Sequence, residues 1–124
     1  MKTPKPVLDR RRSIRVAEKL PFRIGHRDYE TEARTINISC QGALCIVDLD
    51  IPLMTQLQVA LSLPPLRKGA SHAKTIPIKG VVVRKDKDAA GRQFLIAIYF
   101  SEIRPSDREF LEKFIESRLP ADAQ

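Results

Sequence analysis

The chain has 124 residues, 43% of them hydrophobic and 30% charged, which is the composition of one soluble globular domain and excludes general disorder. Its longest apolar run, residues 94–100, is much shorter than the roughly 20 residues that span a membrane. The N-terminus is polar and lacks the apolar segment of a secretory signal, so we expect a cytoplasmic protein without membrane insertion. The 22 Lys+Arg outnumber the 15 Asp+Glu, and the net charge of +7 favours an anionic partner.

The first part of the chain is rich in charge and shows no sustained periodicity, so we expect a flexible basic arm at 1–18 before a folded domain at 19–119. Six later segments show the residue alternation or the short apolar run that is typical of strands: 20–24, 29–38, 43–47, 57–63, 76–83 and 93–100. In the fifth of them, Pro77 predicts an edge or an unpaired amide and Gly80 predicts a bulge. We therefore predict an all-β fold, a six-stranded antiparallel barrel whose closure removes exposed edges.

The pattern changes to a helical one near the C-terminus. Apolar residues recur on one helical stripe at positions 110, 111, 114, 115 and 119. This helix begins either at Pro105, which suits the first helical position, or at a capping box made by Ser106 and Glu109. Pro120 ends it, and 120–124 form a tail. We predict that the helix covers one open end of the barrel.

No catalytic or metal-binding signature is present in the sequence. His26 and His72 lie in polar loop contexts without a partnering motif, and no phosphate-binding loop or nucleophile elbow occurs. Cys40 and Cys45 are five positions apart without a second pair or a nearby histidine, so they predict no zinc site. We therefore expect a protein that is not an enzyme and that needs no metal or cofactor.

Arginines gather near the end of the arm, where four of them fall within six positions: Arg10, Arg11, Arg12 and Arg15. Guanidinium groups bind phosphate oxygens in pairs, stack on base faces and recognise the O6/N7 edge of guanine. Two arginines four apart lie at most ~13 Å from each other in an extended chain, a reach that suits a ligand with two phosphates and two guanines. Taken alone, the cluster is more typical of a solvated basic tail.

A second polar segment, residues 37–42, lies between two predicted strands. Asn37 and Ser39 have short side chains that can bond a purine edge or the backbone of their own turn. Gly42 can supply a positive φ or let a ligand approach the backbone closely. By itself this segment could equally be a well-made turn.

Together the two segments resemble the signature of the PilZ family, RxxxR in an N-terminal loop followed by [D/N]xSxxG on the barrel. Arg11-x-x-x-Arg15 and Asn37-x-Ser39-x-x-Gly42 match both halves. The resemblance implies a receptor for the bacterial second messenger cyclic di-GMP. It also implies that Arg11 and Arg15 bind phosphates and guanines, that Asn37 and Ser39 bond guanine edges, and that Gly42 shapes the turn beneath the base.

The resemblance covers residues 8–119 and extends to the strand and helix patterns. It implies a six-stranded antiparallel barrel with a C-terminal helix, in agreement with the periodicity. One departure is Ala97, where many members have glycine, and we expect it to affect packing rather than binding. Arg10 is a further ligand candidate, because an arginine before the motif is associated in the family with a stacked ligand dimer.

The resemblance leads to a mechanism in which the ligand orders the arm and a downstream protein reads the changed surface. Two alternatives remain at this point. A PilZ-fold adaptor that binds no nucleotide would act by protein contact alone. A small-barrel nucleic-acid binder would need aromatic stacking platforms, yet the chain has no Trp and only seven Phe and Tyr, so we expect no DNA or RNA partner.

Overall fold

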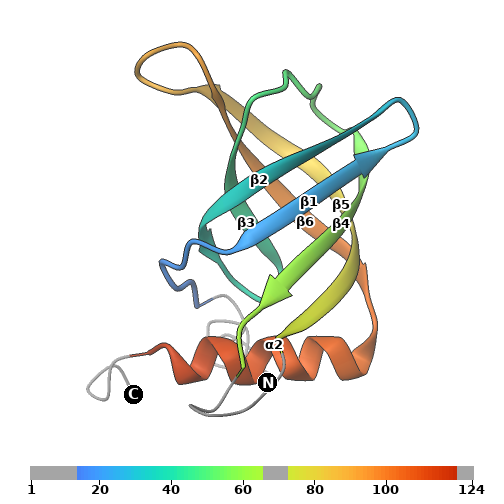
Figure 1. The fold of residues 1–124 in the computed structure, drawn as a ribbon, viewed down its shortest axis with the longest axis vertical. Coiled ribbons are helices and arrows are strands. Elements are labelled where there is room, and N and C mark those ends of the chain that lie inside the picture. The colour runs from blue at the N-terminus through green and yellow to red at the C-terminus, as the bar shows by residue number, and fades with distance from the viewer. Residues whose placement is uncertain (1–13, 66–72, 120–124) are drawn as a thin grey trace, which may run out of the picture.

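The computed structural model describes residues 14–65 and 73–119. In these ranges six strands close into an antiparallel barrel in the order β1-β2-β3-β6-β5-β4, and one helix follows (Figure 1). The elements are β1 (Pro21–His26), β2 (Tyr29–Ile38), β3 (Gly42–Val47), β4 (Gln56–Leu63), β5 (Lys74–Lys87), β6 (Phe94–Ile103) and α2 (Pro105–Ser117). The predicted all-β barrel with a C-terminal helix is confirmed.

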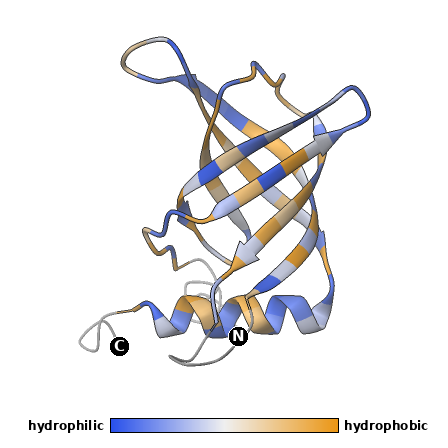
Figure 2. Cartoon of the chain, in the orientation of Figure 1, coloured by the Kyte–Doolittle hydropathy of each residue, from blue (hydrophilic) through white to orange (hydrophobic). Residues whose placement is uncertain are grey.

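The core fills the inside of the barrel, because alternate residues of each strand point inward. In β4 the inward residues Leu57, Val59, Leu61 and Leu63 are all buried, and Figure 2 shows bands of opposite hydropathy along the strands. Burying one such side chain contributes about 1.5–3 kcal/mol. The barrel is therefore a packed scaffold, and ligand chemistry belongs to its outer surface and ends.

Helix α2 lies across one end of the barrel (Figure 1), and its residues Leu111, Phe114 and Ile115 are buried there. It begins at Pro105, with Arg104 as the residue before it and no side-chain capping hydrogen bond. The capping box at Ser106 is therefore wrong and the start at Pro105 is right. The fixed φ of proline begins the helix two residues earlier than a cap at Ser106 would, which leaves the serine inside the first turn.

Strand β5 is longer than the predicted 76–83 and reaches Lys87, because its last residues pair with β6 beyond the apolar core. Pro77 pairs with Ala60 of β4 but precedes the first β6 partner, so it lies where one side of β5 is unpaired. A register shift at Gly80 confirms the predicted irregularity there. The predicted strand is too short because the outer end of β5 is charged and shows no apolar alternation.

Cys45 gives a first testable prediction. Its side chain is fully buried in the barrel, and burial raises the pKa of the Cys45 thiol above its ordinary value. Since the thiolate is the reactive form, Cys45 should resist iodoacetamide in the folded protein at pH 8 and react only in denaturant. Mass spectrometry of the labelled peptides reads this out. Rapid labelling of Cys45 in the native protein would contradict the burial.

Candidate functional site

A β-bulge in β2 sets the direction of Asn37. Thr35 pairs with Cys45 of β3 and Asn37 pairs with Leu44, so Ile36 is an extra residue on β2. Thr35 and Ile38, three positions apart, are both buried. Strict alternation after Thr35 would instead turn Asn37 into the core. The bulge therefore places Asn37 at the barrel surface, where it is half-buried.

A short bridge brings the arginine segment to the same place. Val16 and Ile38 exchange two backbone hydrogen bonds, each 3.0 Å long, and Val16 is buried. Arg15 lies next to this bridge, and its Nη1 donates a hydrogen bond to Asn37 Oδ1 at 2.8 Å. One residue from each predicted motif, 22 positions apart, therefore meets at the surface. Residues 14–18, which the sequence placed in the arm, lie against the barrel.

Thr35 secures the segment between this bridge and β1. Its hydroxyl donates to the carbonyl of Glu18 and accepts a hydrogen bond from the Leu20 amide at 2.8 Å. The Glu18 carboxylate also lies 3.4 Å from Nε of Arg118, which follows α2. Sequence reasoning missed this role. The available signal was a hydroxyl at an inward-facing position of an apolar strand, since a buried hydroxyl needs hydrogen-bond partners.

Ser39 belongs to the turn between β2 and β3 and is buried. Its amide donates to the Gly42 carbonyl at 2.8 Å. Its hydroxyl donates to the same carbonyl at 3.3 Å and accepts from the Gln41 amide at 3.2 Å. Of the two uses that the sequence suggested for this hydroxyl, the structure shows the one toward the backbone of its own turn.

Gly42 begins β3 under the close approach of β6. A Cβ atom at this position would lie 2.4 Å from the backbone oxygen of Ile98, closer than real Cβ contacts. The expectation of a positive φ is wrong, because Gly91 is the one glycine with positive φ in the described ranges. The space that the missing side chain leaves is taken by the neighbouring strand. Glycine is required here because two strands come together beneath the turn.

The other two predicted site residues, Arg10 and Arg11, lie outside the described residues. A groove of about 780 Å³ adjoins the site along β2, where Thr35 and Ile36 line it. Lys19 and Arg34 line the same groove. Glu32 and Asp48 also line it, so the groove is mixed in charge and the cationic character of the site rests on Arg15 itself.

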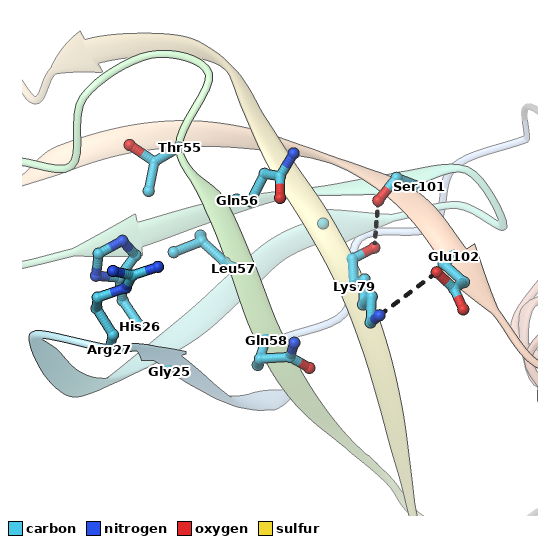
Figure 3. A pocket seen from close by; sticks show the side chains of 11 residues that line it. Gly25, His26, Arg27, Thr55, Gln56, Leu57, Gln58, Lys79, Ser101 and Glu102 are labelled. Atoms are coloured by element: carbon cyan, nitrogen blue, oxygen red, sulfur yellow. Dashed lines mark hydrogen bonds and ion pairs between the residues drawn. The ribbon is translucent and has the colours of Figure 1, made fainter.

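A groove of about 840 Å³ lies elsewhere on the barrel, between the β1–β2 turn and strands β4 to β6 (Figure 3). None of the sequence-predicted residues in the described ranges lines it. Its Lys79 is paired with Glu102 at 3.7 Å, and Ser101 Oγ donates to the Lys79 carbonyl at 3.1 Å (Figure 3). Because none of the motif residues in the described ranges lies in this groove, it is a weaker candidate for the ligand site than the face around Arg15.

Comparison with known families identifies the chain. The model of the PilZ domain matches residues 9–117, a range that includes both motifs. The chain belongs to the PilZ domain family. PilZ domains are a family of cyclic di-GMP receptors, and they are binding and adaptor domains rather than enzymes. The match extends over the barrel and α2, so both the motifs and the fold support membership of this family.

Two solved structures share the fold of this PilZ domain. The Bacillus subtilis inhibitor of motility MotI/DgrA matches with a TM-score of 0.74 and 22% identity over 85% of this chain. The present chain spans about half of that protein, 49% of its length. The PilZ domain of YcgR from Escherichia coli, solved with c-di-GMP, matches with a TM-score of 0.59 and 12% identity, covering 85% of this chain and 88% of that one.

A search of curated proteins by sequence finds no match. In the part of the chain that the structure describes, no helix is both long and apolar enough to cross a membrane.

Proposed function

We propose that this PilZ domain is a receptor for cyclic di-GMP that holds the ligand between its N-terminal arginines and the outer face of β2 and β3. The observation that carries the proposal is the 2.8 Å hydrogen bond between Arg15 and Asn37. It joins the last arginine of one motif to the first residue of the other. An exposed guanidinium beside an amide supplies donors and an acceptor in one place, as recognition of a phosphate and a guanine edge requires.

The parts of the site have different tasks. Arg15 and Asn37 contact the ligand, while Ser39 and Gly42 hold the turn that carries Asn37 and β3 in register. Arg11 and Arg10 add further guanidinium groups from the preceding residues. Ligand phosphates neutralise these charges and fix the arginines relative to the barrel. The ordering costs about 1–2 kcal/mol per residue, which charge-assisted contacts offset.

The output is a changed surface that a downstream protein reads. The docked segment supports this route, because Val16 and Glu18 link the arginine segment to the barrel and to Arg118 after α2. Arg15 therefore lies on a segment that contacts both the barrel and the end of α2, so a change in its position can alter the surface at both places. No chemical step by this chain is needed.

Titration calorimetry of cyclic di-GMP tests the proposal. We expect saturable binding by the unaltered protein and about 10- to 100-fold weaker binding by Arg15→Ala, which is the range for losing one hydrogen bond to a charged group. Arg27→Ala is the matched control. Arg27 is also exposed and carries the same charge, but it lies in the β1–β2 turn, which projects away from α2 (Figure 1).

Equal losses in the two arginine variants would show that binding depends on net charge alone. GTP should give no comparable heat. Excess single-stranded DNA should not displace the ligand, and displacement would favour a general nucleic-acid binder.

A further inference from the structure

Tyr99 differs from the other aromatic residues in its exposure. Its side chain is 52% exposed, whereas the remaining aromatic side chains are buried or partly buried. It is the one aromatic among the large apolar side chains that are exposed in the described ranges. Its neighbours Ile98 and Phe100 are buried, so strand alternation points Tyr99 to the outer face of β6.

This tyrosine stands directly beside the second motif. Tyr99 is the β6 partner of Gly42, and the Phe100 amide donates to the Gln41 carbonyl at 2.8 Å. A Cβ built on Gly42 would lie 3.5 Å from the Cα of Tyr99. The aromatic ring therefore emerges from the barrel next to a residue that has no side chain to cover it.

The surface between Tyr99 and Asn37 is small and apolar. Asn37 pairs with Leu44, Leu44 pairs with Ala97, and Ala97 precedes Tyr99 by two positions on the same face of β6. Neighbouring strands lie about 4.8 Å apart and two residues along a strand span about 6.8 Å, so Asn37 on β2 and Tyr99 on β6 are roughly 12 Å apart across β3. That is the scale of a nucleotide with its phosphate at one end and its base at the other.

We propose that Tyr99 is a base-stacking residue of the ligand site, on whose ring one guanine of the bound nucleotide lies, above Gly42. The inference rests on the proposed function and adds a subsite that the two motifs do not contain. Stacking uses the flat face of a base and an exposed ring. Gly42 places no side chain between Tyr99 and the turn that carries Asn37, and Arg15 with Asn37 receives the phosphate side.

Substitution at Tyr99 gives the binding test. Tyr99→Ala should weaken cyclic di-GMP binding about 5- to 150-fold, which is the contribution of stacking one base. Tyr99→Phe should bind like the unaltered protein, because the ring and not the hydroxyl makes the contact. Val83→Ala is the control, since Val83 is 51% exposed on the adjacent strand β5 and should leave the Kd unchanged.

Tyrosine emission gives a direct second readout. The chain has two tyrosines and no Trp, so Tyr29→Phe leaves Tyr99 as the sole tyrosine. This background change is mild, because the buried Tyr29 hydroxyl has no hydrogen-bond partner among the described residues. A stacked guanine should shorten the fluorescence lifetime of Tyr99, and lifetimes are insensitive to absorption of the exciting light by the ligand.

The outcomes separate the two proposals. Ligand binding in calorimetry with an unchanged Tyr99 lifetime and normal affinity of Tyr99→Ala would overturn the stacking subsite and leave the receptor function standing. Absence of binding by the unaltered protein would overturn the receptor function and the subsite with it. Loss of affinity in Tyr99→Ala, recovery in Tyr99→Phe and a shortened lifetime support the subsite.

Discussion

Gly42→Ala is expected to destabilise the barrel by about 3 kcal/mol, the upper part of the range for overpacking a well-packed site. The new methyl group would lie 2.4 Å from the backbone oxygen of Ile98, and a backbone atom inside a closed sheet cannot rotate away as a side chain can. Relief requires β3 and β6 to separate where Gly42 pairs with Tyr99. Urea unfolding followed by circular dichroism measures the change.

Two other glycines provide graded controls. Gly25→Ala should change the free energy of unfolding by less than about 1 kcal/mol, because its Cβ would make only ordinary contacts of 3.7 Å and longer. Gly80→Ala should fall between them, since its Cβ would lie 2.5 Å from a side-chain atom, Cγ2 of the buried Ile98, and 3.2 Å from a backbone atom, the Tyr99 oxygen. Equal stability of the Gly42 and Gly25 variants would show that β6 does not exclude a side chain at Gly42.

Thr35→Val is expected to cost about 2–4 kcal/mol, because two backbone groups lose their partner at once. The Thr35 hydroxyl accepts from the Leu20 amide at 2.8 Å and donates to the Glu18 carbonyl. Valine has the same shape and would be equally buried, but it has no hydroxyl group to accept from the Leu20 amide or to donate to the Glu18 carbonyl. The lost hydrogen bonds lie in the segment before β1, which carries Arg15. The affinity for cyclic di-GMP should therefore fall together with the stability.

Thr35→Ser is the matched control for this change. Serine keeps the hydroxyl and loses one methyl group, so it should retain most of the stability and the affinity. Hydrogen exchange locates the effect, and the amides of Val16 and Leu20 should exchange faster in Thr35→Val than in Thr35→Ser. If valine and serine behaved alike, the hydroxyl would not secure the segment.

Both substitutions concern residues that position the site rather than contact the ligand. Gly42 sets the approach of β3 to β6, and Thr35 sets where the chain enters the barrel. Ligand-contacting groups perform well when such supporting residues restrict them. Gly42 of the second motif therefore also stabilises the barrel. A loss of binding in variants of this motif should be compared with their free energy of unfolding.

Much of the fold follows from local pattern. Period-two alternation or a short apolar run located all six strands, and helical spacing located α2, because inward residues of a closed barrel and of a covering helix must be apolar. The charged end of β5 was missed because it is not buried and so shows no apolar pattern. Residues up to Lys87 are held by cross-strand hydrogen bonds to β6 and not by burial, so their hydropathy carries no strand signal.

The site divides in a similar way. Its chemistry could be predicted from the residues: an arginine cluster, the Asn-x-Ser-x-x-Gly turn and, through the resemblance, the family. How these parts are arranged depends on contacts between distant segments. A one-residue bulge at Ile36 turned Asn37 outward, the Val16 bridge brought Arg15 to it, and β6 made Gly42 necessary while placing Tyr99 beside it. Bulges, bridges and strand approaches depend on partners distant in the chain, and no local pattern of residues records them.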